Sequence, residues 1–140
     1  MRILFDTDVI LDVLLARPPH AIASSQLLNL ADQEKIEGLV CATTVTTVYY
    51  LASKSVGRRR ALKAIRELLG IFDVAMVDKP VLDSALRSAI NDFEDAVVHE
   101  SARSAGATGI VTRNIKDFRR ATLTIFSPQE LLNAAASLDS

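Results

Sequence analysis

The feature that most constrains the fold is an alternation of short apolar runs with longer helical segments. Apolar runs at residues 3–5, 38–41, 72–77, 109–112 and 123–126 have the length of β-strands. Helical patterns separate most of them, which is typical of βαβ units. Strands connected in this way lie parallel in one sheet that helices cover. We therefore predict an α/β protein with a central parallel sheet of about five strands.

The segments between these runs carry helix start and stop signals. Asp6-Thr7-Asp8 supplies helix-starting side chains, and Arg17-Pro18-Pro19 ends the first helix because proline cannot continue it. Further helices are predicted at residues 20–35, 43–54, 58–69, 80–90, 92–106 and from 128 onward, where Ser127 is the expected N-cap. The 43–54 segment begins with six β-branched residues and would also suit a strand. The inward-facing residues expected on two of these helices are Ile22, Leu27, Leu28, Leu30 and Ala31, and Leu62, Ile65 and Leu69.

Length and composition favour a single domain without a membrane helix, and exclude a globally basic nucleic-acid binder. A chain of 140 residues suits one domain, spanning 1–140, and no apolar run approaches the ~18 residues that a membrane helix needs. The net charge of −1 excludes a globally basic nucleic-acid binder, so binding to a polyanion would need local basic patches or a metal ion. The single cysteine, Cys41, has no partner in the chain and is expected to be a buried small hydrophobe. A reducing, cytoplasmic compartment fits this usage.

Acidic residues gather where function is expected in such a sheet, beyond the carboxyl ends of the strands. Asp6 follows the first strand, Asp92 and Asp95 lie one turn apart on one helix, and Asp117 follows the fourth strand. If these segments converge, Asp6, Asp95 and Asp117 surround one crevice with Asp92 nearby. Crowded carboxylates repel unless a cation lies among them, and hard oxygen ligands suit Mg²⁺ or Mn²⁺. The sequence therefore predicts an acidic metal site.

Each of these residues also has a purely structural interpretation. Asp6 and Asp92 are good helix N-caps, while Asp117 and Asn114 suit a solvated loop and a turn. The remaining candidates are expected to have capping, surface, structural or solvated roles: Asp8, Asp12, His20 and His99.

Two clusters of basic residues stand out. One comprises Lys54, Arg58, Arg59, Arg60, Lys63 and Arg66, and the other Arg113, Lys116, Arg119 and Arg120. They are either solvated faces of amphipathic segments or phosphate contacts beside the acidic site. Few aromatic residues lie between them, so base stacking on an aromatic sheet surface is not indicated.

Three segments together resemble the PIN-domain family, and within it the VapC-type toxins of prokaryotic toxin–antitoxin pairs. They are residues 3–12 (ILFDTDVILD), 92–97 (DFEDAV) and 111–118 (VTRNIKDF), in the family's order and across nearly the whole chain. The resemblance implies a three-layer α/β fold with a parallel sheet flanked by helices on both faces. It also implies a metal-dependent ribonuclease that binds an antitoxin protein and forms a homodimer.

The same resemblance assigns roles residue by residue. Asp6, Asp95 and Asp117 match the family's acids, which hold Mg²⁺ or Mn²⁺, with Asp92 as an outer ligand. Thr112 and Asn114 match positions that support the site or orient water. Thr47 departs from the pattern, because the family usually has a glutamate at that point after the second strand. Asp92 or Glu94 is expected to supply the missing charge.

Two other classes of function remain open on sequence grounds. The first is a binding module without catalysis, favoured by Thr47, with an exposed apolar groove built from Leu14, Leu27 and Leu30 as its partner site. The second is phosphoryl transfer of the haloacid-dehalogenase kind, which the Asp6-Thr7-Asp8 opening resembles. The chain offers no matching lysine motif or late Gly-Asp pair for that chemistry.

Overall fold

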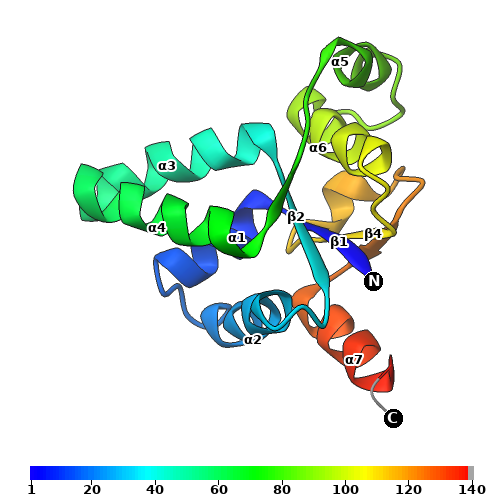
Figure 1. Ribbon diagram of the computed structural model, residues 1–140. Coiled ribbons are helices and arrows are strands. Elements are labelled where there is room, and N and C mark those ends of the chain that lie inside the picture. Colours follow the sequence, from blue (N-terminus) through cyan, green and yellow to red (C-terminus); the bar gives the residue numbers. More distant parts are fainter. Residues whose placement is uncertain (139–140) are drawn as a thin grey trace.

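A computed structural model describes residues 1–138 as strands and helices in regular alternation (Figure 1). The strands are β1 (Arg2–Phe5), β2 (Glu37–Cys41), β3 (Asp73–Ala75), β4 (Gly109–Val111) and β5 (Thr124–Phe126). The helices are α1 (Thr7–Leu14), α2 (Ala21–Asp32), α3 (Ala42–Val56), α4 (Arg58–Ile71), α5 (Lys79–Leu86), α6 (Phe93–Ser104) and α7 (Pro128–Leu138). A 3₁₀ turn, η1 (Ile115–Phe118), follows β4.

All five strands are parallel, in the spatial order β3-β2-β1-β4-β5. The first strand is therefore central, with β2 on one side and β4 on the other. Because the strands are parallel, their carboxyl ends meet at one edge, and the segments that follow β1, β2 and β4 start side by side. The predicted parallel sheet of about five strands is confirmed.

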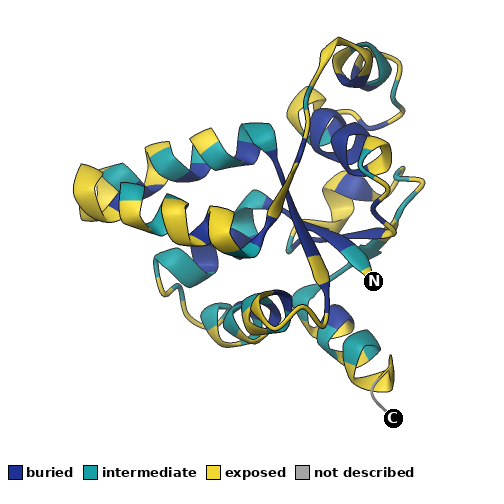
Figure 2. Ribbon diagram, in the orientation of Figure 1, coloured by how far each residue is buried: buried dark blue, intermediate teal, exposed yellow. Residues whose placement is uncertain are grey.

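Helices cover both faces of the sheet, so the core has two halves (Figure 2). Ile3 and Phe5 point to the face covered by α1, α2, α3, α4 and α7, whereas Leu4 between them points to the face covered by α5, α6 and η1. This alternation follows from the two-residue period of a strand. The predicted three-layer arrangement is confirmed.

Helices α3 and α4 form an arm that projects from the sheet (Figure 1). Gly57 alone joins them with φ of +89°, a conformation that side chains other than glycine rarely adopt. The β-branched residues at the start of α3 do not make it a strand, because Thr44 and Val48 lie one turn apart and both face the interior. Within residues 1–138, no helix is long and apolar enough to span a membrane.

Two predicted inward faces are partly wrong. Ile22 is 74% exposed and Leu69 is 47% exposed, whereas Ser24 and Leu68 are buried. In both helices the true inner stripe is rotated from the one expected. The expected groove is also wrong: Leu27 is fully buried, and Leu14 and Leu30 pack against the same core. These leucines hold helices together and are not an exposed docking surface.

Candidate active site

Asp6 ends the central strand and starts the first helix. One carboxylate oxygen accepts a hydrogen bond from the Thr7 N–H at 2.9 Å, and the other accepts one from the Thr112 hydroxyl at 2.8 Å. Thr112 follows β4, the neighbouring strand, and is fully buried. Its hydroxyl also accepts from the Asn114 N–H at 3.0 Å. Asp6 is thus both the N-cap foreseen and a carboxylate fixed by the adjacent strand.

Asp92 and Asp95 lie at the start of α6. Asp92 is the N-cap, and its side chain accepts a hydrogen bond from the Asp95 N–H at 2.9 Å. Asp92 and Glu94 are exposed, whereas Asp95 is half-buried at the level of the sheet edge. Asp92 is thus the helix N-cap that the sequence predicted. The second oxygen of its carboxylate makes no hydrogen bond within residues 1–138.

Asp117 lies on η1 and is exposed. Its N–H donates to the Asn114 carbonyl at 3.0 Å, which closes the turn between them. The exposed Asn114 side chain makes no hydrogen bond within residues 1–138. Asn114 therefore forms a turn through its backbone and leaves its amide group available to a ligand.

The carboxylates from these separate segments affect one another electrostatically. Burial, and after it the charges of Asp92, Asp6, Asp117 and Glu94 in that order, together raise the pKa of Asp95 to about 7. Burial and the charge of Asp8 raise the pKa of Asp6 to about 6, against hydrogen bonds from Thr112 and Thr7 that lower it. The structure thus brings Asp6, Asp95, Asp117 and Asp92 into one acidic cluster.

Two further acids act on this cluster: Glu94, which was expected to be a source of the missing charge, and Asp8, for which a capping or surface role was expected. Glu94 acts on both Asp6 and Asp95. Asp8 is half-buried, and its Oδ1 is buried with no hydrogen-bond partner among residues 1–138. Burial also raises the pKa of Asp8. The signal in the sequence for Asp8 is the Asp6-x-Asp8 spacing, which also fits helix capping.

Asp12 contradicts the surface role that we expected for it. Its side chain is fully buried and forms a two-point ion pair with Arg113, with Nε to Oδ2 at 2.6 Å and Nη2 to Oδ1 at 3.2 Å. Arg113 consequently does not belong to a free basic patch. Its guanidinium group is paired with Asp12 of α1, and its backbone N–H donates a hydrogen bond to the Asp8 carboxylate at 3.2 Å.

The side of the site formed by α3 carries hydroxyl groups and no carboxylate. The Thr44 hydroxyl lies 3.1 Å from that of Thr7, and Thr47 donates to the Thr43 carbonyl at 3.1 Å. No Asp or Glu occurs in α3, and the nearest acids named above come from α1, α6 and η1. The acidic cluster therefore receives no carboxylate from α3.

No three His, Cys, Asp or Glu side chains within residues 1–138 are arranged to hold a metal ion by themselves. The donor set nevertheless suits a hydrated Mg²⁺ or Mn²⁺. Mg²⁺ usually takes one or two protein carboxylates and completes its shell with water and substrate phosphate. Asp8 repels Asp6, and Asp92, Asp6 and Asp117 repel Asp95, so a bound cation would relieve these repulsions; Asp8 Oδ1 is also buried with no hydrogen-bond partner among residues 1–138.

The two histidines differ in environment. His20 is half-buried at the start of α2, whereas His99 is 3% exposed inside α6, one turn beyond Asp95. His99 is structural, as expected, although it is buried and not on a polar face. Cys41 is buried, as expected.

Comparison with known proteins places this geometry in context. The family model described as PIN domain matches residues 2–116. The chain is 24% identical over 134 residues to Ribonuclease VapC1 of Aquifex aeolicus (strain VF5), covering 92% of each protein.

Solved structures share the fold at lower sequence identity. VapBC2 from Rickettsia felis, bound to a DNA fragment from their promoter, superposes with a TM-score of 0.72 at 16% identity, covering 91% of this chain and 98% of that one. The sarcin-ricin loop cleaving toxin VapC20 of Mycobacterium tuberculosis gives 0.63 at 16% identity, covering 77% and 86%. Because the matching family model spans well over half of the sequence, the chain belongs to the PIN domain family.

Proposed function

We propose that this protein is a metal-dependent endoribonuclease of the VapC toxin kind, acting in the cytoplasm. The observation that carries the proposal is the convergence of Asp6, Asp95 and Asp117 from three segments of chain at one sheet edge. The family match and the similarity to Ribonuclease VapC1 support RNA as the substrate.

Asp6, Asp95 and Asp117 would hold Mg²⁺ or Mn²⁺, with Asp92 as an outer ligand. When bound, such an ion polarises a phosphodiester and lowers the pKa of water. The chain's own residues position these acids. The Thr112 hydroxyl orients the carboxylate of Asp6, and the Asp92 side chain caps the start of α6 by accepting a hydrogen bond from the Asp95 N–H. The free amide of Asn114 can donate to or accept from a substrate phosphate or water.

The test is cleavage of a mixed panel of RNAs by purified protein with Mg²⁺ or Mn²⁺. Cutting should stop with EDTA and with Asp95→Asn. Asp73→Asn, on the exposed edge strand β3, is the matched control and should cut like wild type. Cutting that persists in Asp95→Asn would identify a contaminating nuclease or a wrong assignment.

An antitoxin partner and a homodimer belong to the same proposal. The solved VapBC complexes support the partner by similarity. Expression of the wild-type protein should arrest growth while Asp95→Asn should not, and light scattering should give twice the monomer mass of 15.2 kDa. Growth arrest by both proteins would separate toxicity from catalysis.

The absence of an acid from α3 favours a second candidate, a PIN module that binds protein or RNA without cutting. This module would bind Mg²⁺ weakly and leave every RNA in the panel intact. The same cleavage assay, combined with calorimetric titration of Mg²⁺, distinguishes the two candidates.

A further inference from the structure

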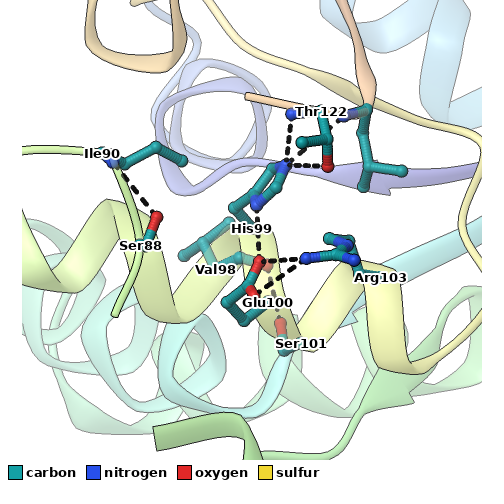
Figure 3. A network of polar contacts seen from close by, with 9 residues as sticks. Ser88, Ile90, Val98, His99, Glu100, Ser101, Arg103 and Thr122 are labelled. Carbon is teal, nitrogen blue, oxygen red and sulfur yellow. Dashed lines mark hydrogen bonds and ion pairs between the residues drawn. The ribbon is translucent and has the colours of Figure 1, made fainter. Parts of the chain in front are cut away.

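A polar cavity of about 360 Å³ lies beside α6, outside the acidic cluster. Three arginines from separate segments line it: Arg87 follows α5, Arg103 belongs to α6, and Arg120 follows η1. His99 and Glu100 form part of its wall (Figure 3). Neither the acidic cluster nor the family assignment uses this surface.

A buried hydrogen-bond network fixes the wall of the cavity. The Thr122 N–H donates to His99 Nε2 at 3.1 Å, so Nε2 acts as the acceptor and the ring proton lies on Nδ1. Nδ1 then donates to Glu100 Oε2 at 2.7 Å (Figure 3). Because His99 is buried in α6 and Thr122 follows Arg120 by two residues, this network attaches the arginine-bearing loop to α6.

The cavity carries a positive charge that the protein does not balance. Glu100 is paired with Arg103 at 3.1 Å, and His99 is neutral as its hydrogen bonds define it. Arg87 and Arg120 are exposed and form no ion pair within residues 1–138. With three arginines against one glutamate, the lining has two positive charges in excess.

The cavity continues toward the acidic cluster. A second cavity of about 220 Å³ is lined by Lys116, Asp117, Arg119 and Arg120, so Arg120 belongs to both. A basic surface therefore leads from Asp117 of the cluster, past Arg119 and Arg120, to Arg87 and Arg103. We call these four arginines the arginine track. Among the described residues, no Phe, Tyr or Trp lines either cavity, and His99 is buried in the wall of the first, so base stacking is not indicated there.

We propose that the arginine track binds successive phosphates of single-stranded RNA on one side of the bond to be cut. The inference rests on the proposed function for its substrate. Arg87, Arg119 and Arg120 form no ion pair within residues 1–138, and guanidinium groups match phosphate oxygens in charge and planar geometry. Contacts to the backbone alone carry no base sequence, so the track adds affinity and fixes direction without selecting a motif.

The test measures RNA binding separately from cutting. Asp95→Asn protein in EDTA is titrated against fluorescein-labelled single-stranded RNA of mixed sequence. The track variant adds Arg87→Gln and Arg120→Gln, and the control variant adds Lys35→Gln and Lys79→Gln, at exposed positions outside both basic clusters. Both variants lose two positive charges, so any effect of net charge alone is equal.

Each lost phosphate contact should lower the slope of log K against log salt by about 0.7 for a single strand, so the track variant should lose about 1.4. The control should keep the slope of the Asp95→Asn parent. Equal slopes for both variants, or no RNA binding even at ~50 mM salt, would overturn the track. If wild-type protein cuts no RNA yet the track variant loses its slope, the track stands and the nuclease proposal fails.

Discussion

Arg113 and Asp12 are 101 residues apart in the chain, yet their side chains meet at 2.6 and 3.2 Å in a two-point ion pair. The carboxylate is fully buried, and its only other cation among residues 1–138 is Arg17 at 4.0 Å. The pair joins α1 to the loop after β4, and thus connects the two segments that carry Asp6 and Asp117. The shape of the acidic cluster depends on this connection.

Removing one partner of the pair should therefore destabilise the fold. Arg113→Gln leaves a buried carboxylate with one distant cation, and we expect the free energy of unfolding in urea to fall by about 3 kcal/mol. Asp12→Asn combined with Arg113→Gln should recover part of this loss, because no unpaired charge remains. Arg119→Gln, at an exposed arginine, is the control and should stay within ~0.5 kcal/mol of wild type. A loss in the double variant as large as in Arg113→Gln would contradict the argument.

The Thr112 hydroxyl should control the Asp6 carboxylate. Thr112→Val keeps the shape but removes the donor to Asp6 and the acceptor for the Asn114 N–H. We expect a loss of stability of about 1–3 kcal/mol and a pKa of Asp6 above about 6, measured by NMR titration of the carboxyl carbon. Thr112→Ser keeps the hydroxyl and should leave the pKa of Asp6 near its wild-type value. An unchanged pKa of Asp6 in Thr112→Val would refute the role.

The acidic cluster should make the metal-free protein less stable as pH rises. The folded-state pKa values of Asp6 and Asp95, about 6 and about 7, lie above the ordinary value of 3.8. The folded protein therefore binds protons more tightly than the unfolded chain, and this contribution to stability is complete below about pH 4 and lost as pH rises through 6 to 7. Melting temperatures in EDTA of wild type minus Asp95→Asn should fall across that window. A difference that does not change with pH would disprove the coupling.

Restoring an acid on α3 should strengthen cation binding. Thr47→Glu places a carboxylate on the side of the site that has hydroxyls alone, and we expect tighter Mg²⁺ binding by calorimetry and lower stability in EDTA. Thr46→Glu is the matched control, since the neighbouring side chain is exposed and makes the same type of hydrogen bond to Thr43. Equal Mg²⁺ affinity in both variants would show that Thr47 does not face the cluster.

The order of strands and helices was predictable because it depends on local patterns. The apolar runs and the caps at Asp6, Asp92 and Ser127 lie within a few residues of the elements that they start. The helix faces were less predictable: in α4 both Leu68 and Leu69 fit an apolar stripe, and a rotation of one residue decides which is buried.

The acids of the site were predictable, because Asp92 and Asp95 lie one turn apart at the start of a predicted helix and the others follow strands. Asp6 and Asp117 mark strand ends, but the partner of Asp12 lies 101 residues away, and no local pattern indicates it. The same holds for His99, whose neutral, buried state depends on the backbone of Thr122. Half of the arginine track could be predicted from the sequence, because Arg119 and Arg120 are adjacent. Arg87 and Arg103 are distant in the sequence and come close to them only in the folded chain.

The central position of β1 determines when the acidic cluster can form during synthesis. β1 leaves the ribosome well before its partner β4 and the hydroxyl that orients Asp6, which come more than 100 residues later. A nascent chain can pair β1 with β2 early, yet it has neither Thr112 nor Asp117 until β4 and η1 have also been translated. A chain that stops before Thr112 therefore lacks the assembled acidic cluster, and under the proposed function such a truncated product would be inert toward RNA.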